Sequence, residues 1–207
     1  AFPCLVIFIL SSCVFAERER VYSCYRLIRK PVLDGNLRND PAWENISTVT
    51  DFIKLGTTSL ASKQTCFRIG YTPEAIYIGI ECEEPEIEKV KAELKDNESL
   101  WTEDSMEIFI FPKGVDNYYQ FVVNTIGSHW NGVRDKRCRT VGPQPSLWGW
   151  QAKTYKGNDY YSVEIRIPLE IFLTIPEKGE EWTGNICRNI YTFGDRHTCW
   201  AHLKAGF

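Results

Sequence analysis

The sequence has little of what a membrane-spanning, zinc-clustered or polyanion-binding protein needs. It contains one methionine, three histidines, no Cys-x-x-Cys pair and no run of like charges among 24 basic and 27 acidic side chains. Balanced charge argues against nucleic acid as a partner. His129, His197 and His202 lie near no cysteine pair at zinc-ligand spacing, which disfavours a structural metal cluster. No apolar stretch reaches the roughly 20 residues that a membrane-spanning helix needs.

The first residues have the pattern of a secretory signal peptide. Leu5–Leu10 form an apolar core too short to span a bilayer, and Val14-Phe15-Ala16 precede the charged Glu17–Arg20. This pattern predicts cleavage after Ala16, so that residues 1–16 are a signal peptide and residues 17–30 a lead-in to the domain. Because an initiator methionine and a basic n-region are missing, we expect the sequence to be a fragment at this end.

Cysteines are numerous enough for disulfides in an exported protein. Beyond Cys4 and Cys13 there are six: Cys24, Cys66, Cys82, Cys138, Cys187 and Cys199. Cys187 and Cys199 flank a turn near Phe193-Gly194-Asp195, so a hairpin could place them opposite each other as a candidate disulfide. Leu10-Ser11-Ser12-Cys13 also fits a bacterial lipoprotein box, in which Cys13 would carry lipid, but simple secretion is our preferred prediction.

Short strands and turns dominate the rest of the chain. Phe67, Ile69 and Tyr71 alternate before the turn Thr72–Ala75, and Ile76, Ile78 and Ile80 alternate after it. Pairing across the turn places Phe67 by Ile80, Ile69 by Ile78 and Tyr71 by Ile76, all on one buried face. This alternation predicts a β-hairpin.

Further strands are predicted by the same pattern, and one helix interrupts them. The strands are expected at 105–111, 118–125, 149–155 and 161–167, with a final hairpin of 184–191 and 199–203. Ile87, Val90 and Leu94 lie at helical spacing, which predicts a short amphipathic helix over 86–95. The chain is therefore predicted to be all-β. Residues 31–207 would form one antiparallel β-sandwich, immunoglobulin- or jelly-roll-like, with one short helix.

Residues 99–112, near the middle of the chain, combine an aromatic ring, carboxylates and an apolar strand. Trp101 opens the segment, Glu103 and Asp104 follow, and an apolar run then carries Glu107. A charged side chain in such a strand costs free energy unless it has partners or a ligand. A ring that stacks on the C–H face of a pyranose, beside a carboxylate that accepts from its hydroxyls, is what a sugar site needs. The alternative is a core tryptophan and a structurally paired glutamate.

Several motifs follow one another along the chain in a specific order. They are Pro31–Gly35 followed by Asp40–Trp43, Tyr71–Ile78, Trp101-x-Glu103-Asp104-Ser105-x-Glu107-Ile108-Phe109, Tyr119–Asn124, Val163–Pro168, Gly184–Arg188 and Cys199-Trp200. This series resembles the family 9 carbohydrate-binding modules, which occur attached to xylanases and other secreted polysaccharide-degrading proteins. The resemblance runs from about Pro31 to the C-terminus. Since members of that family continue into one more strand, the C-terminus is expected to be truncated.

The resemblance implies a binding site for oligo- or polysaccharides such as xylan or cellulose. Two tryptophan plates that hold a sugar at a chain end fall on Trp101 and Trp200, and polar contacts fall on Glu107 and Asn124. Paired plates cover both faces of a pyranose while fixed polar groups satisfy its hydroxyls.

Two positions depart from the family pattern. Val122 stands where well-described members have arginine, and another hydrogen-bonding position falls on Cys187. We expect Arg188 to compensate by contacting hydroxyls or pairing with Glu107. The resemblance further implies a non-catalytic module, with any hydrolase activity in an attached domain.

Other side chains have competing interpretations. Trp148 and Trp150 could form a further platform, although packing is preferred, and Trp43 and Trp182 are predicted to be core residues. His197 could reach the slot, although a surface loop position is preferred. The family often binds calcium, so Asp34, Asp40 and Asp104 are candidate ligands, but no loop has a diagnostic ligand spacing.

Two other classes of protein, a glycoside hydrolase and a haem-binding domain, fit the sequence less well. In a glycoside hydrolase, Glu103 and Glu107 could form a carboxylate pair, but four residues along a strand separate them by about 13 Å, more than either mechanism uses. A haem-binding cytochrome domain needs axial Met/His or His/His ligands. Met106 is the only methionine, and strand alternation would place it and Glu107 on opposite faces.

Overall fold

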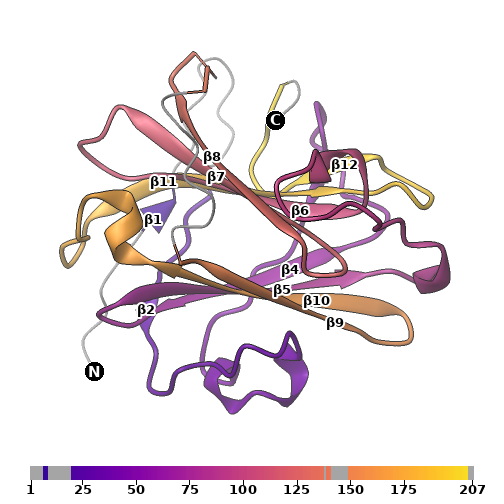
Figure 1. Ribbon diagram of the computed structural model, residues 1–207, viewed down its shortest axis with the longest axis horizontal. Helices are drawn as coiled ribbons and strands as arrows, with labels where there is room; N and C mark the ends of the chain where they lie inside the picture. Colours follow the sequence, from indigo (N-terminus) through magenta and orange to yellow (C-terminus); the bar gives the residue numbers. More distant parts are fainter. Residues whose placement is uncertain (1–6, 9–19, 138, 141–148, 205–207) are drawn as a thin grey trace.

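Two β-sheets lie face to face and form a sandwich (Figure 1). The computed structural model describes residues 7–8, 20–137, 139–140 and 149–204. In order, the larger sheet contains β3 (Ile53–Lys54), β12 (His197–Cys199), β11 (Glu181–Asn189), β6 (Ser105–Phe111), β7 (Asn117–Asn124) and β8 (His129–Asp135). The seventh strand of this sheet is β1 (Ile7–Phe8), which pairs in parallel with β11. The five-stranded sheet contains β2 (Tyr25–Arg26), β4 (Thr65–Tyr71), β5 (Ala75–Glu83), β10 (Tyr160–Pro168) and β9 (Gln151–Lys156). The all-β sandwich is confirmed.

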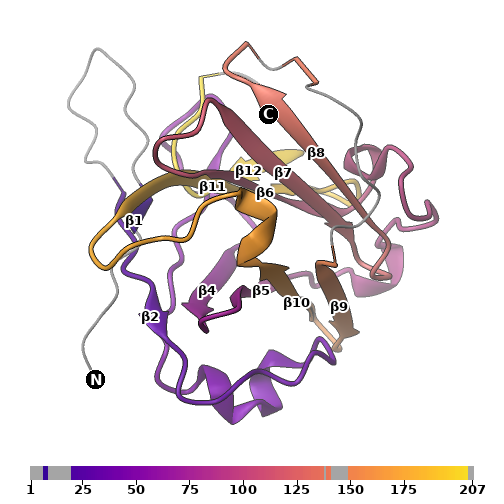
Figure 2. The same ribbon diagram turned by 60° about the vertical axis from the view of Figure 1, so that its left-hand side comes forward.

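The main core lies between the sheets. Alternate residues of β6, among them Ile108 and Ile110, face Ile78 and Ile80 of β5 and Val163 of β10 in one cluster of buried apolar side chains. A smaller cluster covers the outer side of the five-stranded sheet, where η1 (Leu37–Asn39) and η2 (Pro41–Trp43) lie (Figure 2). A third, small cluster of Ile53, Cys187 and Cys199 lies on the outer face of the larger sheet, and the polar residues beside it form the candidate site.

The predicted hairpin of β4 and β5 is confirmed in its register. Phe67 pairs with Ile80, Ile69 with Ile78 and Tyr71 with Ile76. Alternation of large apolar residues therefore determined both the face and the register, since a one-residue slip would expose all of them.

Most other predicted strands are present with shifted ends. β6 has the predicted bounds, and β7, β9 and β10 differ by one or two residues at each end. β10 ends at Pro168, one residue beyond the predicted end, and η5 (Leu169–Phe172) follows. In the last hairpin, β12 is shorter than the predicted strand and begins earlier.

The predicted amphipathic helix over 86–95 is wrong. Only η3 (Ile87–Lys89) forms, a single 3-10 turn. The backbone N–H of Lys91 donates to the Asp104 carboxylate, and those of Glu93 and Leu94 donate to Glu103. These N–H groups are therefore not available for helical bonds to carbonyls four residues earlier, and the segment follows the two carboxylates instead.

Candidate functional site

The outer face of the seven-stranded sheet carries Glu107 at its centre. Strand register places Cys187 of β11, Glu107 of β6, Val122 of β7 and Trp130 of β8 in one row across the sheet. The neighbouring residues of β6, Met106 and Ile108, point into the core. The row and the residues around it therefore share the face opposite to the core.

Glu107 is held by two amide side chains from the neighbouring strands. Nε2 of Gln120 donates to Oε2 of Glu107 over 2.6 Å, and Nδ2 of Asn189 donates to Oε1 over 2.8 Å. Only 2% of Glu107 is exposed. Burial raises the pKa of Glu107 above its usual range, and the bonds from Asn189 and Gln120 partly offset this rise.

These bonds belong to a longer chain that crosses five strands. Nε of Arg134 on β8 donates to Oε1 of Gln120 over 2.8 Å, and Nδ1 of His197 on β12 lies 2.9 Å from Oδ1 of Asn189. We call the series His197–Asn189–Glu107–Gln120–Arg134 the polar belt. It places one carboxylate between two neutral amides, with a cationic side chain at one end.

Aromatic rings lie at the β8 side of the same face. Trp101, in η4 (Leu100–Thr102), meets Trp130 edge-to-face with ring centroids 5.3 Å apart, and both rings are half-buried. The loop that carries Trp101 is fixed by Tyr191, whose hydroxyl donates to the Trp101 carbonyl. Trp101 therefore lies on the sheet face that carries Glu107, and its role as a sugar plate stays a prediction. Trp130 is an aromatic neighbour that was not among the predicted site residues.

Trp200 does not form the second plate. It is 4% exposed, lies in the main core and meets Phe67 edge-to-face at 5.2 Å. Cys199 pairs with Cys187 on the outer side of the sheet, so the next residue, Trp200, points inward. The predicted slot between Trp101 and Trp200 is therefore wrong.

Arg188 does not hold Glu107 either. Cys187 is the register partner of Glu107, so Arg188 faces the core. Its Nη2 donates to the Glu84 carboxylate over 3.1 Å and to the Glu83 carbonyl, and both Arg188 and Glu84 are fully buried. Asn189 occupies the role that the sequence analysis gave to Arg188.

Asn124 forms hydrogen bonds within the protein. Its amide nitrogen donates to Leu94 O and to Glu103, and its oxygen accepts from the backbone of Ile126 and Ser128. The amide oxygen therefore holds the β7–β8 turn and the amide nitrogen holds the segment of Leu94 and Glu103, while the contact of Asn124 with sugar stays a prediction. Glu103 is fully buried in the same network, which removes it as one half of a catalytic pair with Glu107.

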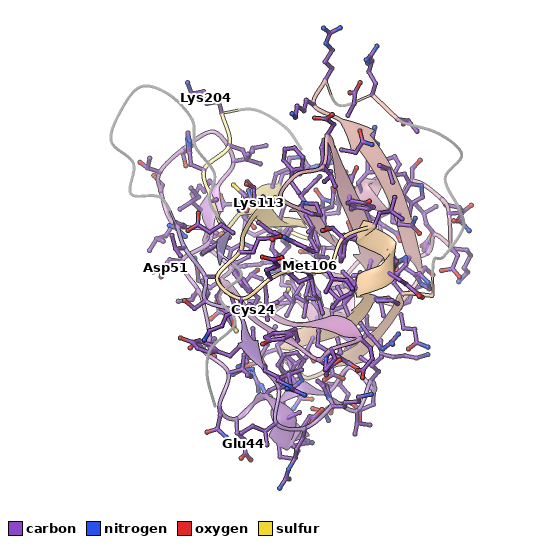
Figure 3. The ribbon with its side chains drawn as sticks, turned by 90° about the vertical axis from the view of Figure 1, so that its left-hand side faces the viewer. Cys24, Glu44, Asp51, Met106, Lys113 and Lys204 are labelled. Carbon is purple, nitrogen blue, oxygen red and sulfur yellow. The ribbon has the colours of Figure 1, made fainter. Side chains whose placement is uncertain are left out.

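Met106, the candidate axial ligand of the cytochrome alternative, lies inside the sandwich (Figure 3). It is fully buried, and its Sδ lies 3.5 Å from Sγ of Cys82. Since Glu107 points to the other side of the sheet, Met106 cannot contribute to a site on the outer face.

The remaining tryptophans that the structure describes pack as predicted. Nε1 of Trp43 donates to buried Glu164, Trp150 donates to Asn131 and packs on Phe121, and Trp182 lies in the main core. Trp148 lies outside the described residues.

Asp34, Asp40 and Asp104, the candidate calcium ligands, accept backbone hydrogen bonds in separate places. Asp34 accepts from Asn36, Asp40 from Val32 and Ala42, and Asp104 from Lys91 and Tyr191. Within the described ranges, no group of three or more His, Cys, Asp or Glu side chains could hold a metal ion. These three residues therefore do not form a calcium site together, and calcium stays a prediction without a defined position.

Cys187 and Cys199 face each other across β11 and β12, as the hairpin predicted. Both are buried free thiols, and burial raises the pKa of each. The register agrees with the predicted pair, while the disulfide itself stays a prediction.

Alternation contains the signal that identifies the missed residues. Gln120 and Val122 have the same parity along β7, and Asn189 and Cys187 along β11, so each pair shares a face. Once Cys187 is placed opposite Glu107, Asn189 must be on that face and Arg188 cannot be. Trp130 and Arg134 share parity on β8 in the same way.

The described chain is a β-sandwich whose larger sheet carries aromatic rings beside a hydrogen-bonded carboxylate on its outer face. Residues 47–197 match the family described as Carbohydrate-binding family 9. The chain belongs to this family, which confirms the resemblance inferred from its motifs. Among curated proteins, no sequence matches this chain.

Solved structures share the fold at low sequence identity. A candidate carbohydrate-binding protein from Bacteroides uniformis is 17% identical with a TM-score of 0.63, over 77% of this chain and 79% of that chain. A family 9 module from Caldicellulosiruptor kristjanssonii in complex with glucose is 20% identical with a TM-score of 0.60, over 84% and 82%. A second structure of such a module from that organism, with cellotriose, is 19% identical with a TM-score of 0.56, over 83% and 78%.

Proposed function

We propose that the outer face around Glu107 binds carbohydrate and that the chain is a non-catalytic binding module. The observation that carries this proposal is the buried Glu107 carboxylate, held by two neutral amides on the sheet face that also carries Trp101 and Trp130. A carboxylate with hydrogen-bonding capacity left is an acceptor for sugar hydroxyls, and a ring can cover a C–H face of the same sugar. Membership in carbohydrate-binding family 9 supports the same function.

Glucose and short β-glucans are the first ligands to test. Relatives with this fold were solved with glucose and cellotriose. We further propose that the module is secreted and keeps an associated glycoside hydrolase near its polysaccharide, since tethering raises the local concentration without new chemistry. Among the described residues, no helix is long and apolar enough to cross a membrane. Release of sugars from polysaccharide by the purified chain alone would contradict the non-catalytic role.

Trp101→Ala should weaken glucan binding while leaving the fold intact. Trp101 is half-buried in a short 3-10 turn outside the main core, so its removal takes away a stacking surface rather than core packing. Stacking of a nucleic-acid base on one aromatic ring contributes about 1–3 kcal/mol, and we expect a loss of this order for a sugar. Isothermal titration with glucose and cellotriose measures the loss.

Tyr155→Ala is the matched control for Trp101→Ala. Tyr155 is an exposed aromatic residue on β9 of the other sheet, so its removal should leave glucan binding unchanged. Equal affinities of the Trp101→Ala variant and the wild type would contradict the aromatic part of the site.

Binding should weaken as the pH falls through the pKa of Glu107. Burial raises this pKa, and only the ionised carboxylate offers acceptors on both oxygens. The charged and titratable neighbours are Arg134 and His197 at the ends of the polar belt and Cys187 opposite Glu107. Burial and Arg196 lower the pKa of His197, and burial raises the pKa of Cys187, so neither alters the expected direction.

Stability has the opposite pH dependence, which separates loss of binding from unfolding. A carboxyl whose pKa is raised in the folded state stabilises the fold below its unfolded pKa, and this contribution is lost as the pH rises through the folded value. Titrations with glucose between about pH 4 and pH 8, with thermal unfolding measured in parallel, test the prediction. Constant affinity over this range would show that Glu107 ionisation does not govern binding.

A further inference from the structure

Glu107 has fewer donors than the other buried glutamates. Glu84 accepts from four groups, including Lys63 and Arg188. Glu103 and Glu164 each accept from three. Among the residues that the structure describes, Glu107 accepts from Gln120 and Asn189 only. Since a carboxylate has about four acceptor positions, each oxygen of Glu107 keeps one.

The direction of each hydrogen bond in the polar belt is fixed from its ends. Arg134 can only donate, so the Gln120 oxygen must face it and the Gln120 nitrogen must face Glu107. At the other end, Nδ2 of Asn189 donates to both Glu107 and the Ser105 hydroxyl, which leaves its oxygen for the Nδ1–H of His197. If either amide group were rotated by 180°, its NH₂ group would face another donor or its oxygen would face the Glu107 carboxylate.

We propose that Arg134 and His197 are positioning residues that keep Glu107 an acceptor on both oxygens. The sugar site then recognises two neighbouring hydroxyls that both act as donors. This inference rests on the proposed function and specifies the class of ligand: a neutral sugar with a vicinal diol. Arg134 and His197 act through Gln120 and Asn189, and the ligand occupies the acceptor positions that those amides leave free.

Fluorinated sugars test the donor requirement directly, because fluorine replaces a hydroxyl but cannot donate. Two adjacent positions of glucose should each lose affinity about tenfold or more when fluorinated, as much as when the hydroxyl is deleted. Fluorination at the other positions should have little effect. If the wild type binds glucose and tolerates fluorine at every position, the inference is wrong while the proposed function holds. If it binds none of the glucose and cello-oligosaccharide probes, the proposed function fails.

A swap of side chains tests the polarity of the belt. In Glu107→Gln, the new NH₂ group must face the NH₂ group of either Gln120 or Asn189, so that two donors meet. Glucose affinity and melting temperature should therefore both fall. In Glu107→Gln/Gln120→Glu, residue 107 donates to the new carboxylate, which also accepts from Arg134, so the melting temperature should recover. One of the two sensitive glucose positions should then tolerate fluorine, since it faces an N–H. No recovery in the double variant would contradict the fixed polarity.

Arg134→Met provides a test that does not alter Glu107. Loss of this cation and of the fixed Gln120 donor should move the pH midpoint of glucose binding upward, and Arg134→Lys should restore it in part. Arg139→Met is the matched control, because Arg139 is exposed and pairs with Asp135 at the end of the same strand. Equal midpoints for Arg134→Met and Arg139→Met would overturn the positioning role, even if the Glu107 variants fail to fold.

Discussion

Trp200→Ala is expected to destabilise the fold by about 3–5 kcal/mol, the usual cost of deleting a buried large aromatic side chain. The indole lies between the sheets against Phe67, and its backbone N–H donates to Ile186 of β11. Domains of this size have about 5–15 kcal/mol of stability, so the variant should be close to unfolding at moderate temperature. Urea or guanidinium unfolding followed by tryptophan fluorescence measures the change.

Trp101→Ala serves as the reference for this experiment. It should lower stability far less than Trp200→Ala, since Trp101 lies outside the main core, but it should reduce sugar binding. Conversely, the folded fraction of Trp200→Ala should retain sugar affinity. If Trp200→Ala remained as stable as the wild type and lost binding, the core position of Trp200 would be wrong.

Strand positions in this chain could be predicted because apolar alternation is strong and local. Six alternating side chains around Thr72–Ala75 determine the β4–β5 register, and a continuous apolar run defines β6. These features depend on residues close together in sequence, and exposing any of the six would cost burial free energy.

Register between distant strands could not be predicted in the same way. Whether Arg188 or Asn189 faces Glu107 depends on the pairing of β11 with β6, which are about 80 residues apart in sequence. A cation beside a buried carboxylate is favourable, so Arg188 was the expected partner of Glu107, but strand alternation places Arg188 in the core beside the Glu84 carboxylate. Alternation likewise places Trp200 in the core, because its neighbour Cys199 lies on the outer face of the sheet.

Tertiary hydrogen bonds explain the missing helix. The spacing of Ile87, Val90 and Leu94 suits a helix, but local spacing contains no information about distant acceptors. Glu103 and Asp104 come later in the chain, 9 to 13 residues after the N–H groups of Lys91, Glu93 and Leu94 that they bind, and the helix needed those groups. The acidic cluster beside Trp101 therefore shapes the loop that leads to the candidate site, and Glu107 alone remains on the sheet face.

Glu84→Gln should destabilise the protein by about 3–5 kcal/mol, because it leaves two buried cations without a counter-ion. Arg188 is fully buried and Lys63 is 7% exposed, and both bind the Glu84 carboxylate. Glu84 directly follows β5, Lys63 precedes β4 and Arg188 is in β11, so these bonds join the ends of strands in one sheet to a strand of the other. Chemical unfolding at neutral pH measures the effect.

Two variants show whether the loss comes from uncompensated charge or from lost contacts. Arg188→Met removes as many contacts but leaves Glu84 paired with Lys63, so it should cost less than Glu84→Gln. Glu81→Gln breaks the Arg38–Glu81 pair, in which Arg38 is half exposed, and should cost only about 0–1 kcal/mol. If Glu84→Gln lowered the free energy of unfolding no more than Arg188→Met, the charge of Glu84 would not be what stabilises the two buried cations. The charge balance inside the sandwich therefore depends on Glu84, while the Glu107 carboxylate on the outer face is held by the neutral amides of Gln120 and Asn189.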